Sequence, residues 1–119
     1  MFSSMECSIA WARRVLGMLT VTYPPPNGRE FGAFCVVERT GGELAWPHDS
    51  PEISFQLWAD SEDEAEELAN MLAIATVTMP MDDPHVNAMG TPEVLSYGRE
   101  EGGWFVWQVT VPLDVRLTD

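Results

Sequence analysis

His48 and Asp49 come nearest to an acid–base pair in this sequence. An imidazole beside a carboxylate can serve as a general base when a nucleophile lies within its reach. The nucleophile is missing, because Cys35 lies in the middle of an expected strand and no serine stands in a nucleophile-elbow sequence. We therefore expect no enzyme, and we keep catalysis by His48 and Asp49, close to Trp46, as one alternative.

Asp82, Asp83 and His85 form a second group of polar side chains that could bind a divalent cation. Pro84 interrupts the group, and the surrounding segment is rich in proline and glycine. This context is more typical of a solvated turn than of a metal site. We therefore expect neither a metal nor another cofactor.

The length of 119 residues and the two cysteines are typical of a single reduced domain, residues 1–119. A chain of this size buries roughly 65% of its unfolded surface without disulfides. Cys7 and Cys35 fall in an expected helix and strand, which favours buried thiols and a cytoplasmic origin. No apolar run is long enough to span a bilayer, so we expect a soluble, unexported protein.

The charge is strongly negative and restricts the possible partners. Nineteen acidic residues face six basic ones, all arginine, which gives a formal net charge of −13. Proteins that grip nucleic acid need a basic surface to contact the phosphates. Direct binding to DNA is therefore not expected.

Two helices are expected from capping residues and apolar periodicity. Ser61 and Glu64 form a capping-box pattern at the start of a helix over residues 61–79, with further acids in the first turns. Ser3 or Ser4 can cap a first helix, and Ser3 with Glu6 repeats the capping-box pattern there. This helix carries two apolar rows, one of them containing Trp11.

Four strands are expected from alternating apolar residues. They lie at residues 34–39, around residues 53–57, at residues 93–97 and at residues 104–117. Pro112 lies within the last of them, which predicts an edge strand or a bulge there. Residues 41–51 and 80–92 are expected to be loops, because both contain glycine and proline.

This order predicts an α+β fold, a two-layer sandwich with the sequence α-β-β-α-β-β. Two helices would cover one face of a four-stranded, mainly antiparallel sheet. The other face would stay bare, and Trp58, Trp104 and Val106 would lie on it. Such an apolar patch favours contact with another subunit. The alternative is that the loop after the first helix, or residues 80–92, folds over the patch.

These features resemble the tail terminator proteins of long-tailed, siphovirus-type bacteriophages, in particular the small versions of actinobacterial phages. The resemblance is carried by the N-terminal amphipathic helix, the strand end, the acidic helix and the final hairpin that leads into the long last strand. The matching residues are Leu57, Trp58, Ala59 and Asp60, then Glu64, Ala65, Glu67, Leu68 and Ala69, then residues 104–117.

The resemblance implies a structural virion protein that forms a ring, generally of six subunits. The ring would sit on the last ring of the tail tube, end its polymerisation, and offer a surface to the head–tail connector or stopper protein. It would be assembled in the host cytoplasm and located in the tail of the virion. DNA would pass through without specific binding, and no membrane would take part.

Candidate residues for such a ring follow from their types and expected places. Trp58, Trp104 and Val106 would pack between subunits, while Arg13 and Arg14 would pair with acids of a neighbour or cover the core with their alkyl stems. The two expected loops would dock neighbouring rings, and acids of the second helix would line the channel. These last two sets are Trp46, His48, Asp49, Met81, Asp82, Asp83 and His85 for docking, and Glu62, Asp63, Glu66 and Glu67 for the channel.

Two further functions stay open besides the small enzyme. The chain could be another head–tail connector or head-closure component. It could also be an acidic inhibitor that mimics DNA, although such a mimic needs carboxylates spread over one surface, and here five of them fall within two turns of one expected helix.

Overall fold

A six-stranded mixed sheet and two helices make up the computed structural model, which describes residues 1–118. The strand order is β1-β2-β3-β6, and both β4 and β5 pair with the far side of β6. All neighbours are antiparallel except β1 and β2. The elements are α1 (Ser4–Leu16), β1 (Thr20–Val21), a 3₁₀ turn (Gly28–Glu30), β2 (Phe34–Ala45), β3 (His48–Ala59), α2 (Glu62–Thr78), β4 (Val86–Met89), β5 (Glu93–Arg99), a 3₁₀ turn (Glu101–Gly103) and β6 (Phe105–Arg116).

Both helices begin where the capping residues predict. The hydroxyl of Ser61 accepts the N–H of Glu64 at 3.2 Å, and the hydroxyl of Ser3 accepts that of Glu6 at 3.1 Å. Each bond satisfies an amide that has no partner within its helix. The expected helices are therefore confirmed, and α1 ends at Gly17, whose φ of 63° suits a residue without a Cβ.

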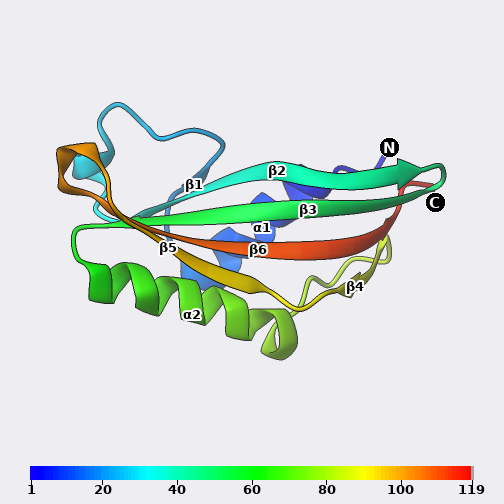
Figure 1. Ribbon diagram of the computed structural model, residues 1–119. Coiled ribbons are helices and arrows are strands. Elements are labelled where there is room, and N and C mark those ends of the chain that lie inside the picture. Colours follow the sequence, from blue (N-terminus) through cyan, green and yellow to red (C-terminus); the bar gives the residue numbers. More distant parts are fainter. Residues whose placement is uncertain (119) are drawn as a thin grey trace.

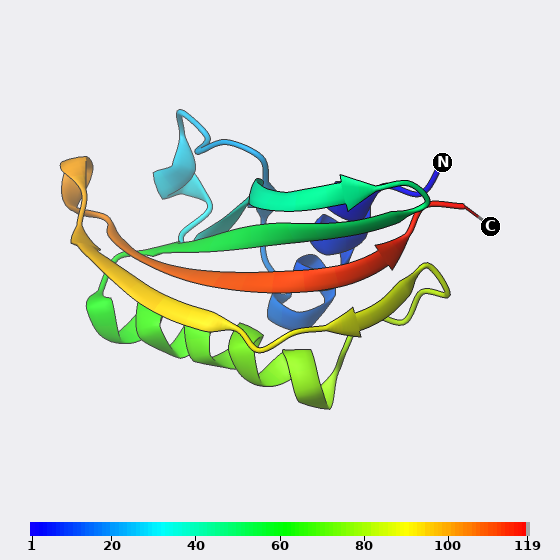
Figure 2. The same cartoon turned by 45° about the vertical axis from the view of Figure 1, so that its right-hand side comes forward.

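The two helices lie on the same face of the sheet, which gives two layers (Figures 1 and 2). Trp11 of α1 is buried against Phe55 of β3, with ring centroids 5.5 Å apart. Leu72 of α2 joins the same core, together with alternate residues of β2, β3 and β6. The expected α+β class is therefore confirmed, and so is the placing of both helices on one face.

The expectation of four strands is wrong, because two short strands extend the sheet. β1 has only two residues and β4 only four, too few to show an alternating pattern. β4 lies within residues 80–92, where the prolines predicted a loop throughout. The order in the structure is therefore α-β-β-β-α-β-β-β.

The expected loop over residues 41–51 is also wrong, because these residues continue a long hairpin. β2 and β3 pair from Phe34 opposite Trp58 to Ala45 opposite His48, and only two residues, Trp46 and Pro47, form the turn. A register shift between Arg39 and Gly41 leaves Thr40 unpaired as a bulge, and Gly41 and Gly42 then pair with Glu52 and Pro51. The hairpin is thus one continuous arm of the sheet.

Pro112 does not mark an edge strand, because β6 lies between β3 and the pair β4 and β5. Its carbonyl accepts the N–H of Gly90, at the break between β4 and β5. The amide nitrogen of a strand residue points to the same side as its carbonyl. An N–H at position 112 would therefore point to this break between β4 and β5. The missing N–H of proline is tolerated there, because the edge of the sheet is interrupted at that point.

Candidate functional site

An aromatic cluster lies at one end of the sheet face that is turned away from the helices. The Phe34 and Trp58 rings stack with centroids 5.4 Å apart, and the Trp104 ring meets Phe34 edge-on at 5.1 Å. Trp104 and Val106 are buried, whereas Trp58 is half-buried. The expectation that all three side chains lie bare is therefore wrong for Trp104 and Val106.

The cover is the segment of residues 22–33, which we name the strap. At one end of the sheet the strap lies beside the turn that precedes β6 (Figures 1 and 2). Gly28 packs so closely on Phe34 that an added Cβ would lie 2.9 Å from that ring. The chain itself thus covers this end of the face. This agrees with the alternative expectation that the loop after the first helix folds over the apolar patch.

Arg29 holds the strap in place. Its guanidinium lies 3.9 Å from the centroid of the Trp104 ring, pairs with the carboxylate of Asp60, and donates to the carbonyl of Gly102. The three contacts join the strap to the end of β3 and to the turn before β6. A cation over an indole ring contributes about 1 kcal/mol at a partly exposed site.

Arg29→Ala is therefore expected to loosen the strap while the sheet stays folded. Local opening should raise hydrogen exchange of the amides in residues 28–31 about fivefold, which corresponds to a loss of about 1 kcal/mol. Hydrogen–deuterium exchange with mass spectrometry measures this. Arg116→Ala, at the far end of β6, is the matched control and should leave the strap unchanged. Equal exchange in both variants would contradict the role of Arg29.

The rest of this face is mainly polar. Gln56, Gln108 and Thr110 lie there in register on β3 and β6, with Glu38 and Glu52 towards the hairpin turn. The two glutamates are exposed. Leu95 of β5 pairs with Gln108 and is 53% exposed, so apolar surface on the rest of this face lies at the edge strand.

His48 and Asp49 do not form an acid–base pair, because neighbouring strand residues point to opposite faces. Asp49 is buried and accepts two hydrogen bonds from the guanidinium of Arg39, at 2.8 and 2.9 Å. His48 is exposed beside the hairpin turn, as is Trp46. Asp49 thus forms an ion pair with Arg39 within the sheet. It is not placed to act with His48 as an acid–base pair.

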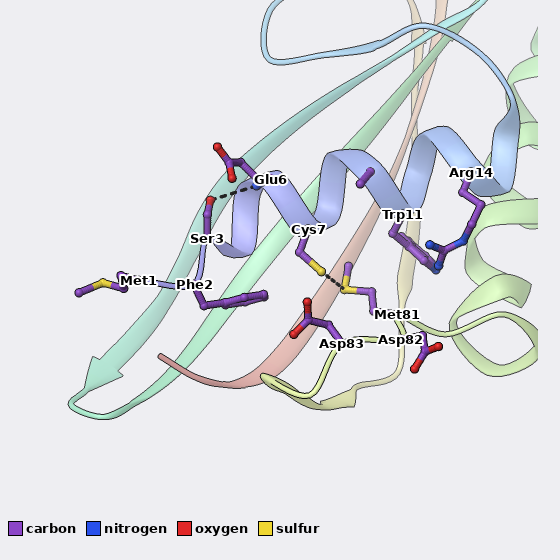
Figure 3. A pocket seen from close by; sticks show the side chains of 11 residues that line it. Met1, Phe2, Ser3, Glu6, Cys7, Trp11, Arg14, Met81, Asp82 and Asp83 are labelled. Atoms are coloured by element: carbon purple, nitrogen blue, oxygen red, sulfur yellow. Dashed lines mark hydrogen bonds between the residues drawn. The ribbon is translucent and has the colours of Figure 1, made fainter. Parts of the chain in front are cut away.

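A hollow of about 450 Å³ lies between the start of α1 and the segment after α2, and it brings together residues far apart in the sequence (Figure 3). Arg14 of α1 lines it together with Met81, Asp82 and Asp83. The Sγ of Cys7 lies 3.9 Å from the Sδ of Met81. Three expected docking residues, Met81, Asp82 and Asp83, thus share one surface depression with Arg14, which was expected at a subunit interface.

Asp83 and His85 form a hydrogen-bonded pair beside this hollow. The Asp83 carboxylate accepts the backbone N–H of His85 at 2.8 Å and lies 3.0 Å from its Nδ1. These bonds, first the one from the backbone and then the one from the ring, lower the pKa of Asp83. The His85 ring also stacks on Phe2, with centroids 4.8 Å apart. The contacts fix the N-terminal residues against the loop.

The thiols are poorly suited to nucleophilic chemistry. Burial raises the pKa of Cys7, Asp83 raises it further, and Arg14 opposes them. Burial raises the pKa of Cys35 to about 12. A thiol attacks as its thiolate, so both groups are mostly protonated near neutral pH. Within residues 1–118 no three His, Cys, Asp or Glu side chains come together in a group that could hold a metal ion.

The remaining expected residues lie at two places. Glu62, Asp63, Glu66 and Glu67 are exposed on the first half of α2. Arg13 donates to the carbonyl of Thr20 at 3.2 Å, so it ties the end of α1 to β1. The structure does not bring the acids of α2 into the hollow, whose carboxylates come from Glu6, Asp82 and Asp83.

No family model and no curated protein matches this sequence. Among the described residues, neither helix is long and apolar enough to cross a membrane. Any function must therefore be argued from the geometry and charge of the chain.

Proposed function

We propose that this protein is a structural subunit of a ring, of the kind that ends a phage tail tube and joins it to the head connector. The observation that carries the proposal is the open sheet with a free edge on each side. β5 pairs only with β6, and β1 covers β2 only at Cys35 and Val36 in the described chain. Two different free edges allow head-to-tail contacts, which form a closed ring when the rotation between neighbouring subunits closes.

The charge suits a ring through which DNA passes. Six chains of −13 would carry a formal charge of −78. At physiological salt, repulsion reaches only about 8 Å, so an acidic wall would prevent DNA from adhering without holding it back from a distance. The exposed acids of α2, Glu62, Asp63, Glu66 and Glu67, are the proposed channel residues in a ring whose α2 helices are not covered by a partner protein.

Electron microscopy of the purified protein, alone and mixed with tail tubes, tests the proposal. We expect six-membered rings, free or seated at tube ends. Leu95→Lys places a charge on the free edge strand β5 and should reduce the fraction of rings several-fold, because charged edges resist strand pairing. A protein that stays monomeric at every concentration and leaves tube ends bare would contradict the proposal.

Phe31→Lys is the matched control for this experiment. Phe31 is 52% exposed and Leu95 53%, and the two substitutions add the same charge. Phe31 lies on the strap, which leads into β2, whereas Leu95 lies on β5 at the other edge of the sheet. Loss of rings in Leu95→Lys alone would therefore implicate the edge, and equal loss in both variants would attribute it to the added charge.

A further inference from the structure

The outer side of α2 carries an exposed apolar stripe in its second half. Met71, Ile74 and Val77 are 43%, 60% and 82% exposed. Their spacing of three residues keeps them on one side of a helix. The opposite side of α2, with Ala65, Ala69 and Leu72, is buried against the sheet. The packing of α2 on the sheet therefore does not involve these three side chains.

The first half of the same outer side is acidic. Asp63 and Glu67 precede Met71 and Ile74 at intervals of three to four residues, and Glu66 flanks them. All three acids are exposed and make no ion pair among those the structure shows. One helix face thus runs from negative charge to apolar surface over the fifteen residues from Asp63 to Val77, or about 21 Å.

We propose that this face of α2 docks an amphipathic segment of another protein that carries basic residues followed by apolar ones. Charge complementarity selects such a partner. Lysine or arginine would neutralise Asp63, Glu66 and Glu67, while leucine-like side chains would cover Ile74 and Val77. A partner helix of four turns matches the length of the face. The β5 strand borders α2 (Figures 1 and 2), and its exposed Val94 adds apolar surface beside the helix.

A second copy of this chain is a poor occupant of the same face. If two α2 helices docked in parallel, acids would oppose acids. If they docked antiparallel, the acids of each would be buried against the apolar half of the other, which leaves carboxylates desolvated without partners. The chain also has no lysine and a net charge of −13. The partner is therefore a different, basic chain.

Fluorescence anisotropy with three synthetic helical peptides tests the proposal. The probe carries lysines in its first two turns and a leucine stripe at helical spacing in its last two turns. One control peptide keeps the lysines but replaces the leucines by glutamine, and the other keeps the leucines but carries glutamate for lysine. Only the leucine–lysine probe should bind well, because it alone satisfies both halves of the face.

Variants locate the site. Ile74→Asp and Val77→Asp should each weaken binding of the probe at least about tenfold, since each places a charge in the apolar contact. Glu66→Gln with Glu67→Gln should weaken binding and lower its salt dependence. Leu44→Asp, an exposed apolar position on β2, is the matched control and should bind as the unaltered chain does. Circular dichroism checks that all variants stay folded.

Three outcomes would overturn the proposal. Equal binding of the glutamine control peptide would show attraction by charge alone. Equal loss in Leu44→Asp would show that the face of α2 is not the site. Self-association abolished by Ile74→Asp, with no binding of the probe, would assign the face to a second copy. None of these measurements requires ring formation, so a failure here is distinct from a failure of the ring proposal.

Discussion

Replacing Trp11 by alanine is expected to lower the free energy of unfolding by about 3–5 kcal/mol, the largest effect of any substitution considered for this chain. The indole is 1% exposed and packs edge-on against Phe55 of β3. Its N–H donates to the carbonyl of Met79 at 2.7 Å, just beyond the end of α2. One side chain thus joins both helices to the sheet, and its removal leaves a cavity and an unsatisfied carbonyl.

Urea denaturation followed by circular dichroism measures this loss. Trp11→Phe keeps much of the ring packing but removes the donor, so it should cost less than Trp11→Ala. Trp46→Ala is the control for loss of an indole at the surface, because Trp46 is 61% exposed in the hairpin turn. It should change stability by less than about 0.5 kcal/mol. Similar losses for Trp11→Ala and Trp46→Ala would contradict the assigned core.

Gly42→Ala is expected to destabilise the β2–β3 hairpin by about 3 kcal/mol. Gly42 has a φ of 99°, which side chains of L-residues rarely adopt. An added Cβ would also lie 2.1 Å from the carbonyl oxygen of Ser50 on the facing strand. Because the obstacle is backbone, the two strands must separate locally to relieve it.

Gly41→Ala is a closely matched control in the same hairpin. A Cβ there would lie 2.9 Å from Oε2 of Glu52, the far end of a flexible side chain that can move away. We expect a change below about 1 kcal/mol. Thermal unfolding of both variants, with hydrogen exchange of residues 43–50, separates them. Equal stability of the two would contradict the continuous hairpin.

The helices could be predicted because their signals are local. Ser3 and Ser61 each lie three residues before a glutamate and just before a run with helical periodicity, and both cap helices in the structure. The hairpin could not be predicted in full, because Gly41 and Gly42 are also typical of loops. Whether two glycines end a strand or continue it after a bulge depends on the facing strand, which the local pattern does not contain.

The strap was predictable only as a stiff connection. Three prolines at residues 24–26 indicate an extended segment, but its return over Trp104 depends on Arg29 meeting Asp60, thirty-one residues away. The bare apolar face was expected for the same reason, since alternation along β6 places Val106 away from the core row without showing what covers it. Whether this face is covered thus depends on a tertiary contact, which the local sequence pattern does not show.

The hollow beside α1 could not be predicted either. Cys7 and Met81 are separated by seventy-four residues, and no motif links them. Phe2 and Glu6 line the hollow as well, but their types carry no signal of it. By contrast, the acids of α2 lie where their helical spacing predicts, on the exposed side.

The protonated state of both native thiols gives the chain a practical advantage for labelling. Cys35 has a pKa of about 12, and the pKa of Cys7 is also raised. A cysteine introduced on the solvent side of α2 would have an ordinary pKa and would react first with a maleimide dye. A fluorophore can then be attached at one chosen position while the wild-type sulfhydryls remain, so assembly and partner capture can be followed by energy transfer in a chain that is otherwise unchanged.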